Sequence, residues 1–338
     1  MNLKRYIQPA LLYSVALLPL VFSGCDESRV VDKSQKKESV MVNSDEEYVM
    51  VTTAINFPMY VNHDQAAFKR WGNEHGVKTS ILGPSDWDVA AQISTIEQVI
   101  GSKPAGLLIN GTDPGIAQVI NKAVDAGIPT VVYDADIPNA RYHAFLGTDW
   151  YEIGRLQGEA MAKLLNGKGK VAYLGILGMT NMDDGYRGLQ DVFKKYPQIT
   201  IVGRYDDKAN VEEAAHITSD LLRAHPDLAG ICGFDGMSGP GIGLAIREAN
   251  KAGKVKVTAV DWEPEHLQMV KAGIIDHLVG QKRELFTWYG AQFLFDMKHK
   301  INTLTADDEK AGIVAVPHKV NTGLIEINKD NIDQFLKN

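Results

Sequence analysis

Carboxylate, amide and aromatic side chains recur at the ends of the predicted β-strands along this 338-residue chain. Asp, Asn and Gln side chains form hydrogen bonds with hydroxyl groups, and aromatic faces can pack against the apolar faces of sugar rings. A single residue of this kind more often caps a helix or forms a turn, so the recurrence itself is the signal. The segments that carry these side chains are residues 54–60, 83–88, 110–113, 134–136, 181–184, 235–238, 261–263 and 280–281.

The elements that must position these segments alternate between strand and helix, and the alternation occurs twice. The predicted strands are residues 49–53, 77–82, 106–110, 129–133, 170–174, 199–205, 229–234, 256–260 and 276–279. The predicted helices are residues 66–75, 89–101, 116–126, 151–165, 186–195, 211–224, 241–252, 266–272 and 287–297. Strands joined through helices indicate parallel sheets, so we expect an α/β protein with two doubly wound parallel-sheet domains. Ligands of such sheets bind beyond the carboxyl ends of the strands, where the polar segments lie.

The chain begins with a pattern typical of export. Lys4 and Arg5 precede an apolar stretch at residues 10–22, which is too short for a confident membrane span of roughly 20 residues. Phe22-Ser23-Gly24-Cys25 resembles a bacterial lipobox, so we expect residues 1–24 to be a lipoprotein signal peptide with acylation at Cys25. The alternative is an uncleaved N-terminal anchor with an incidental cysteine. Both alternatives place the body of the protein outside the cytoplasm.

Residues 25–46 are polar, mixed in charge and without a sustained period, which predicts a flexible tether. Asp26, directly after the cysteine, resembles the signal that keeps enterobacterial lipoproteins at the inner membrane. The sequence therefore predicts a lipid-anchored protein, at the inner membrane if the host is Gram-negative.

Composition and motifs exclude several other functions. The 35 basic against 42 acidic side chains give a formal charge of −7, which offers no basic surface for nucleic acid. Gly236-Met237-Ser238-Gly239-Pro240 has proline where a nucleophile elbow requires glycine, and the chain contains no P-loop, dinucleotide-binding or H-E-x-x-H pattern. We therefore expect neither an enzyme nor a bound cofactor or metal. Cys232 lies in an apolar run and is predicted to be a core residue.

The chain resembles type I periplasmic sugar-binding proteins, the group that contains the ribose-binding and autoinducer-2-binding proteins. The resemblance covers residues 47–332 and rests on residues 56–60 (NFPMY), 129–134 (PTVVYD), 146–149 (LGTD), 260–261 (VD), 280–281 (GQ) and 321–323 (NTG). It implies two α/β lobes joined by three crossings near Gly147, Gln281 and Asn321. The lobes would comprise residues 47–146 plus 282–320 and residues 147–281 plus 321–338, and would close on a ligand by hinge motion.

The resemblance and the polar segments together predict the ligand-binding residues. They are Phe57, Met59, Tyr60, Asp86, Asp134, Asp136, Asn181, Arg187, Asp235, Asp261 and Gln281. Asp134 and Asp261 each follow a β-branched apolar run, so we expect them to accept hydroxyl hydrogen bonds in the crevice; the alternative is that both cap the following helices.

Departures from the ribose-binding pattern bear on the ligand. Ala135 and Gly185 stand where ribose binders place arginines, although Arg187 lies two residues further on, and Phe57 and Asp235 replace asparagines. The loss of arginines and the gain of carboxylates disfavour ribose and anions. A neutral polyol, an amino sugar or another cation-bearing small molecule fits better.

The family implies a binding component that delivers its ligand to an ABC permease, and we expect a monomer. The alternative is a sensing subunit that presents the bound form to a chemoreceptor or a histidine kinase. A sugar-responsive repressor of the same fold would need an N-terminal DNA-binding domain, but this chain has an export pattern there.

Overall fold

The computed structural model describes residues 45–336. The predicted signal peptide, Cys25 and the predicted tether up to residue 44 lie outside the described residues. Within residues 45–336, no helix combines the length and the apolar composition that a membrane span needs.

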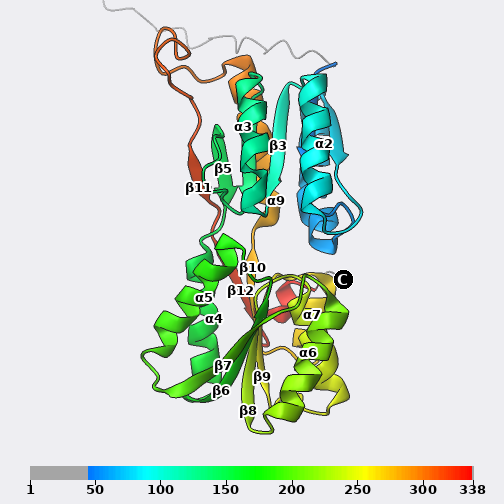
Figure 1. The fold of residues 1–338 in the computed structure, drawn as a ribbon, viewed down its shortest axis with the longest axis vertical. Coiled ribbons are helices and arrows are strands. Elements are labelled where there is room, and N and C mark those ends of the chain that lie inside the picture. The colour runs from blue at the N-terminus through cyan, green and yellow to red at the C-terminus, as the bar shows by residue number, and fades with distance from the viewer. Residues whose placement is uncertain (1–44, 337–338) are drawn as a thin grey trace, which may run out of the picture. The chain divides into compact units, whose positions relative to one another are not determined.

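Two sheets organise this part of the chain (Figure 1). The first runs in the order β2–β1–β3–β4–β5–β11, and all of its pairs are parallel. Its strands are β1 (Glu47–Val51), β2 (Lys78–Leu82), β3 (Gly106–Gly111), β4 (Thr130–Asp134), β5 (Ala144–Gly147) and β11 (Lys319–Asn321). Its helices are a π-helical turn (Tyr60–Gln65), α1 (Ala66–His75), α2 (Val89–Ser102), a 3₁₀ turn (Pro114–Ile116), α3 (Ala117–Asp125) and α9 (Arg283–His299). We call this sheet with its helices the first lobe.

The second sheet repeats the same order, β7–β6–β8–β9–β10–β12. Its edge strand β12 is antiparallel to β10, and the other pairs are parallel. Its strands are β6 (Lys168–Gly175), β7 (Gln198–Asp206), β8 (Leu228–Gly233), β9 (Lys256–Val260), β10 (His277–Gln281) and β12 (Leu324–Asn328). Its helices are α4 (Trp150–Leu164), α5 (Thr180–Phe193), α6 (Val211–Ala224), α7 (Ser238–Glu248), α8 (Pro264–Lys271) and a 3₁₀ turn (Ile332–Gln334). We call this sheet with its helices the second lobe.

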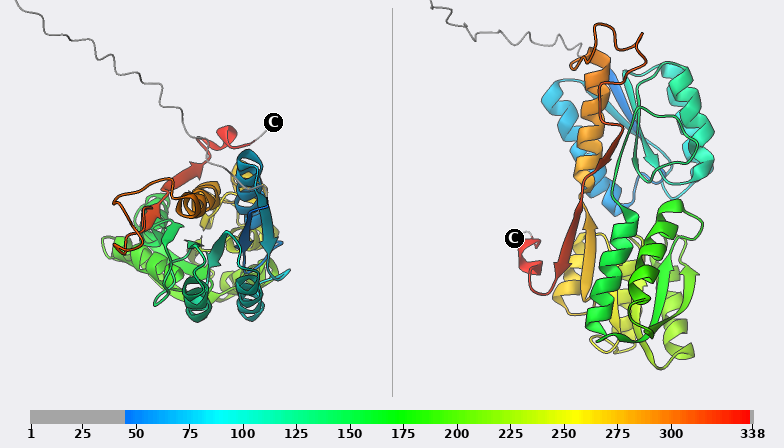
Figure 2. Two further views of the ribbon diagram at one scale, coloured as in Figure 1. Left: turned by 90° about the horizontal axis from the view of Figure 1, so that it is seen from above. Right: turned by 90° about the vertical axis from the view of Figure 1, so that its left-hand side faces the viewer.

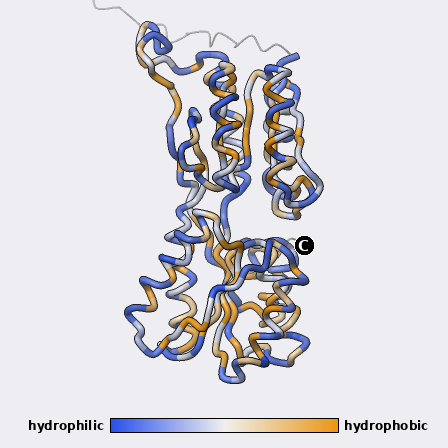
Figure 3. Tube along the Cα trace, viewed as in Figure 1, coloured by the Kyte–Doolittle hydropathy of each residue, from blue (hydrophilic) through white to orange (hydrophobic). Residues whose placement is uncertain are grey.

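Successive strand residues point to opposite faces of a sheet, and here both sets are apolar. Helices therefore cover both faces of each sheet. In β1, Val49 and Val51 belong to a core shared with α2 and α3, whereas Tyr48 and Met50 pack with α1 and α9. Figure 2 shows α3 and α9 on opposite faces of the first sheet. In the second lobe, α4 and α5 share one core and α6, α7 and α8 the other. The helices alternate between hydrophilic and hydrophobic colours along their length, as amphipathic helices do (Figure 3).

The predicted fold class, α/β with two doubly wound and mainly parallel sheets, is confirmed. Sequence patterns missed the short strands β5, β11 and β12, because three to five residues carry too little periodicity to stand out. They also missed the π-helical turn before α1, whose residues do not follow the spacing of an α-helix.

The chain passes between the sheets at three places: from β5 to α4, from β10 to α9 and from β11 to β12. Hydrogen bonds join the crossings side by side. Thr148 Oγ1 donates to Gln281 Oε1 over 2.8 Å, and Thr322 N donates to Gly147 O over 3.0 Å. Because the loops after β4 and β9 lie near these crossings, the crossings position the polar segments of both lobes.

The close contact of α4 with α5 depends on glycine. A Cβ at Gly188 of α5 would lie 2.0 Å from Tyr151 O, so the helices must move apart to admit one. Gly188→Ala is therefore expected to destabilise the protein by about 1–3 kcal/mol in urea unfolding. Gly101→Ala in α2 is the matched control, because nothing lies within 4 Å of a Cβ there and alanine favours the helix by about 0.5–1 kcal/mol. Equal stability of the two variants would contradict this packing.

Candidate functional site

A cavity lies between the loops that follow the strands of the two lobes. Its lining combines carboxylates, amides, one guanidinium and large apolar side chains. These residues are Met59, Tyr60, Trp87, Thr112, Asp134, Arg283 of the first lobe and Trp150, Ile176, Met179, Asn181, Met182, Asp235, Gly236, Asp261, Gln281 of the second. The free space is about 30 Å³, similar to the volume of one water molecule in the liquid. A monosaccharide is far larger, so it can enter only if the lobes separate or the lining side chains move.

Asp134 and Asp261 occupy equivalent places in the two lobes. Each lies at the carboxyl end of the fourth strand of its sheet order, Asp134 as the last residue of β4 and Asp261 directly after β9, and each has a positive φ, +83° at Asp134 and +69° at Asp261. Asp tolerates this left-handed conformation better than most residues, and such strain is concentrated at functional sites. Among the described residues, neither carboxylate accepts a hydrogen bond from a backbone N–H, so the structure does not support the alternative that they cap helices.

Arg283 holds Asp134 in place. Its guanidinium forms a two-bond pair with Asp64, at 3.0 Å from Nε and 2.7 Å from Nη2, and a second with Asp134, at 3.2 Å from Nη1 and 3.1 Å from Nη2. Both Arg283 and Asp64 are almost completely buried. Burial raises the pKa of Asp64 to about 7, although Arg283 opposes that rise. The cluster therefore carries one positive and up to two negative charges away from solvent.

A chain of buried polar side chains supports Asp134 from behind. Asn110 Nδ2 donates to Asp134 Oδ2 over 3.1 Å, and Asn110 in turn contacts Thr53 and Gln92. Because each of these groups is hydrogen-bonded, the Asp134 carboxylate keeps one orientation.

Asp261 is held by the second crossing. Gln281 Nε2 donates to Asp261 Oδ1 over 3.1 Å, while Gln281 Oε1 accepts from Thr148. Burial raises the pKa of Asp261 to about 6, with Arg283 again opposing the rise. Asp261 therefore remains mainly ionised at neutral pH and acts as an acceptor.

Asp235, the other acidic residue of the second lobe that lines the cavity, is both a turn former and a cavity residue. Its Oδ1 accepts from the backbone N–H groups of Met237 and Ser238 at 2.8 and 3.1 Å, at the start of α7. Its other oxygen, Oδ2, accepts from Ser238 Oγ at 2.7 Å. Asp235 thus combines the two roles that the sequence left open for such residues.

Aromatic rings lie along the first-lobe side of the cavity. The Phe57 ring stacks on Tyr60 with centroids 5.8 Å apart and lies 6.0 Å from Trp87, and Tyr60 lies 5.2 Å from the Arg283 guanidinium. Phe57 itself supports the lining rather than forming part of it. Trp150 adds a ring from the second lobe. The cavity therefore offers apolar faces together with hydrogen-bond acceptors.

Contacts between the lobes surround the cavity. Asn62 Nδ2 of the first lobe donates to Glu263 Oε2 of the second over 2.7 Å, and His63 Nε2 lies 2.8 Å from Glu263 Oε1. His63 Nδ1 lies 2.7 Å from Glu284 Oε1 in its own lobe. Burial lowers the pKa of His63, but the two carboxylates outweigh burial and raise it to about 10. His63 is therefore a cation between one carboxylate of each lobe.

Four predicted site residues lie outside the lining of this cavity: Phe57, which packs behind it, and Asp86, Asp136 and Arg187. Asp86 is exposed, and its neighbour Trp87 provides the lining instead. Asp136 binds Tyr142 and Lys319 and lines an adjoining hollow. Arg187 lies on the exposed side of α5 and pairs with Asp184 at 2.9 Å.

The site also contains residues that sequence reasoning missed, above all Arg283 and Asp64. The sequence comparison found no arginine at the positions used by ribose binders, but a guanidinium reaches the cavity from Arg283, two residues after Gln281. The proximity of Arg283 to Gln281, at the second predicted crossing, was the signal in the sequence that could have placed it at the site. Asp64 and His63 lie in the π-helical turn, so helical periodicity could not place them.

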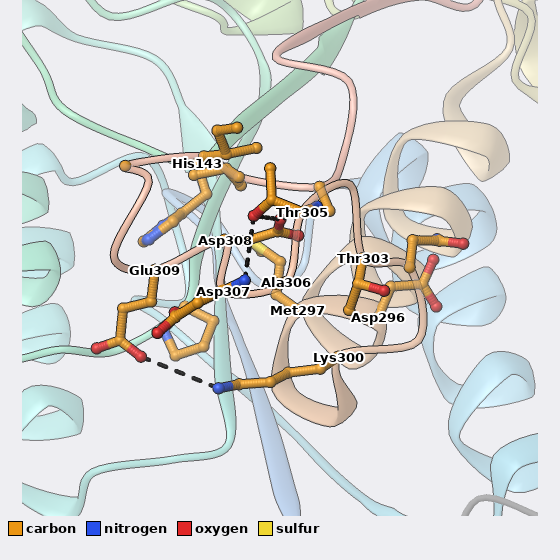
Figure 4. Close-up of a pocket in the computed structure, with 16 residues that line it drawn as sticks. His143, Asp296, Met297, Lys300, Thr303, Thr305, Ala306, Asp307, Asp308 and Glu309 are labelled. Carbon is orange, nitrogen blue, oxygen red and sulfur yellow. Dashed lines mark hydrogen bonds and ion pairs between the residues drawn. The ribbon is translucent and has the colours of Figure 1, made fainter.

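A larger cavity, of about 700 Å³, lies at the loop between α9 and β11 (Figure 4). The carboxylate of Asp308 there accepts from the backbone N–H groups of Leu304 and Thr305 and so holds the loop itself. Lys300 and Glu309 face each other at 3.9 Å. This cavity draws its lining from the first lobe alone, and its Asp308 and Glu309 carboxylates are bound within that lobe, so we place the candidate site between the lobes.

Removal of Arg283 is expected to leave two buried carboxylates without a cation. Arg283→Gln should lower the free energy of unfolding by about 3–5 kcal/mol near pH 8. The loss should grow as pH rises above about 7, because Asp64 of the wild type is then ionised and stabilised by a cation that the variant lacks. Arg187→Gln, at an exposed ion pair, should cost less than about 1 kcal/mol at either pH. A penalty for Arg283→Gln that does not change with pH would contradict this account.

Comparisons with known proteins agree with this fold. Residues 48–300 match the model of the periplasmic binding protein domain family. The D-ribose/D-allose-binding protein of Pseudomonas aeruginosa is 27% identical over 263 residues, which cover 74% of this chain and 80% of that protein. An arabinose-binding protein from Geobacillus stearothermophilus is 32% identical with a TM-score of 0.73, covering 87% of this chain and 100% of that one. The sugar-binding protein of a sugar ABC transporter from Bacillus halodurans is 28% identical with a TM-score of 0.76, covering 86% and 100%. The family predicted from the sequence is thus confirmed, and the chain belongs to the periplasmic binding proteins.

Proposed function

We propose that the protein is the extracytoplasmic sugar-binding component of an ABC transporter. It captures a small sugar or sugar-like ligand between its lobes and passes it to a permease. The observation that supports this most strongly is the cavity itself, which brings carboxylates and aromatic rings from both lobes to one place. Relatives named for D-ribose, D-allose, D-apiose and arabinose are consistent with a small sugar.

The hydrogen-bonding groups of the cavity favour a ligand that donates. Asp134, Asp235 and Asp261 are acceptors, whereas most donors of Arg283 are already bound to Asp64 and Asp134. Sugar hydroxyls can donate to these carboxylates, and such charge-assisted bonds are strong. An anion would face more negative than positive charge, so a neutral or amino sugar fits best.

Binding proceeds by hinge closure in this proposal. The three crossings between the sheets provide the hinge, with the lobe boundaries near Gly147, Gln281 and Asn321. The small free volume and the contacts between Asn62, His63 and Glu263 support a closed form that must open to admit a sugar.

We further propose that the mature protein is a monomer anchored to the membrane by acylation of Cys25. The charged start, the short apolar stretch and the lipobox-like sequence support the anchor. Metabolic labelling with a fatty acid tests it, because Cys25→Ala should abolish the label and release the protein from the membrane.

A thermal-shift screen of the purified protein against pentoses, hexoses, polyols and amino sugars tests the binding function. A sugar at 100 times its Kd should stabilise the folded state by about 2.7 kcal/mol. With the best sugar, Asp261→Asn should weaken binding at least about tenfold, since it removes a charged acceptor while asparagine also tolerates a positive φ.

Asp136→Asn is the matched control, because Asp136 lies outside the cavity lining and should leave the Kd unchanged in calorimetry. Asp134→Asn should also weaken binding, with a loss of stability, because Asp134 is paired with Arg283. Equal Kd values for the wild type and Asp261→Asn would contradict the assignment of the site.

The interlobe contact at His63 predicts a pH dependence of sugar binding. When the lobes part, Glu263 leaves His63, so the closed form binds a proton more tightly than the open form. The contribution of this proton to closure is complete below the pKa that His63 has in the open form, beside Glu284, and is lost as pH rises through about 10.

Glu263→Gln is therefore expected to weaken sugar binding about tenfold near neutral pH, because it removes the partner of a buried charge. Glu284→Gln removes the other carboxylate beside His63 but lies in the same lobe as His63, so it should change the Kd less. Equal effects of the two variants in calorimetry would argue against a contact that stabilises closure.

A further inference from the structure

Asp207 is a buried acid that the proposed binding mechanism does not use. It lies in the loop between β7 and α6 with no exposed surface, and its Oδ2 lies 2.5 Å from Ser238 Oγ. The same hydroxyl lies 2.7 Å from Asp235 Oδ2. Asp235 lines the cavity, whereas Asp207 lies behind it, outside the lining.

If both acids were ionised, the Ser238 hydroxyl would supply the only proton for two short contacts between oxygen atoms. A serine hydroxyl has one proton and can donate it to only one of the two carboxylates. The other short contact is favourable only if that carboxyl group carries its own proton and donates it to Ser238 Oγ. Two adjacent buried carboxylates also disfavour ionisation of both. The geometry therefore requires one protonated acid.

The surroundings identify Asp207 as the protonated member. Asp235 Oδ1 accepts two backbone N–H groups at the start of α7, which stabilises its ionised form. Asp207 Oδ1 accepts only the N–H of Ala209, at 3.3 Å. Burial, together with the neighbouring charge of Asp235, raises the pKa of Asp207 well above that of an ordinary aspartate.

No cationic side chain in the described part of the chain neutralises the charge of these two acids. In residues 45–336, neither Asp207 nor Asp235 forms an ion pair with lysine, arginine or histidine. Arg204 on β7 instead forms an ion pair with Asp183 of α5, at 2.7 Å. Its guanidinium also lies 5.2 and 4.2 Å from the ring centroids of Tyr173 and Tyr186. Tyr173 on β6 is the other titratable group that feels Asp235, and burial keeps it neutral.

We propose that Asp207 is a positioning residue that holds a proton at neutral pH and, together with Ser238, fixes the Asp235 carboxylate as an acceptor facing the ligand. The proton on Asp207 lets Asp235 keep its charge in a buried place without a cation. Asp235 then accepts from ligand hydroxyls, whereas an asparagine there would also offer a donor. The effect on ligand binding rests on the proposed function, whereas the protonation of Asp207 is independent of it.

Asp207→Asn tests the proton in the protein without ligand. Asparagine retains a donor for this cluster but cannot ionise. The folded wild type holds a proton that the unfolded chain releases, so its stability should fall as pH rises from about 5 to about 9. Asp207→Asn should lack this component, so its melting temperature should fall less over the same range and exceed that of the wild type at the alkaline end.

Asp64 and Asp261 also make stability fall with rising pH, but they are present in both the wild type and Asp207→Asn. The difference between the two melting-temperature profiles therefore reports Asp207 alone. Asp206→Asn is the matched control at the neighbouring position, and its profile should run parallel to that of the wild type. Parallel profiles for the wild type and Asp207→Asn would overturn the proposal.

The positioning role is tested with D-ribose, D-allose and D-arabinose. For any of these that binds, Asp207→Asn should keep the Kd within about twofold, whereas Asp207→Ala should weaken binding about tenfold because Ser238 loses the donor that directs its hydroxyl proton to Asp235. Equal losses in both variants would overturn the positioning role. If Asp207→Ala does not fold, Ser238→Ala takes its place. Absence of binding by every sugar in the wild type would count against the proposed function, while the stability profiles would still decide the proton.

Discussion

The buried pairing of Arg283 with Asp64 and Asp134 is the interaction on which the rest of the site depends. Arg283 begins α9 directly after the crossing from the second lobe, Asp64 comes from the π-helical turn and Asp134 ends β4. One guanidinium therefore links a crossing, a helix start and a carboxylate that lines the cavity. Charges this deeply buried are tolerated only when they are paired and hydrogen-bonded, so the pairing constrains the geometry of all three segments.

The two lobes place a carboxylate at the cavity with the same strand order and the same backbone conformation. Both sheets have the same strand order, and in both an aspartate with positive φ lies at the carboxyl end of the fourth strand. The partners differ: Asp134 is held by Arg283 and Asn110, whereas Asp261 is held by Gln281. The common backbone thus presents a carboxylate from each side, and the local partners set its charge and orientation.

Because residues of both lobes line the cavity, the proposed hinge closure makes affinity depend on contacts between the lobes as well as on contacts with the ligand. Met59 Sδ of the first lobe would lie 3.2 Å from a Cβ at Gly236 of the second, so the lobes approach here as closely as the absence of a side chain allows. Asn62, His63 and Glu263 add polar contacts across the same gap. A ligand that favours the closed form gains from these contacts without touching them.

The sequence by itself determined the alternation of strands and helices, the parallel sheets and the carboxylates at strand ends, because these follow from local periodicity and from the rule that ligands bind beyond the carboxyl ends of parallel strands. Together with the family resemblance, these features predicted as ligand-binding seven residues that line the cavity: Met59, Tyr60, Asp134, Asn181, Asp235, Asp261 and Gln281. Tertiary structure alone decided that Asp136 and Arg187 pair elsewhere, and that Arg283, Asp64, His63 and Asp207 meet the site. The physical reason is that Arg283 meets Asp64 and Asp134, and Lys319 meets Asp136, across long sequence separations, and no local pattern records which charges will meet.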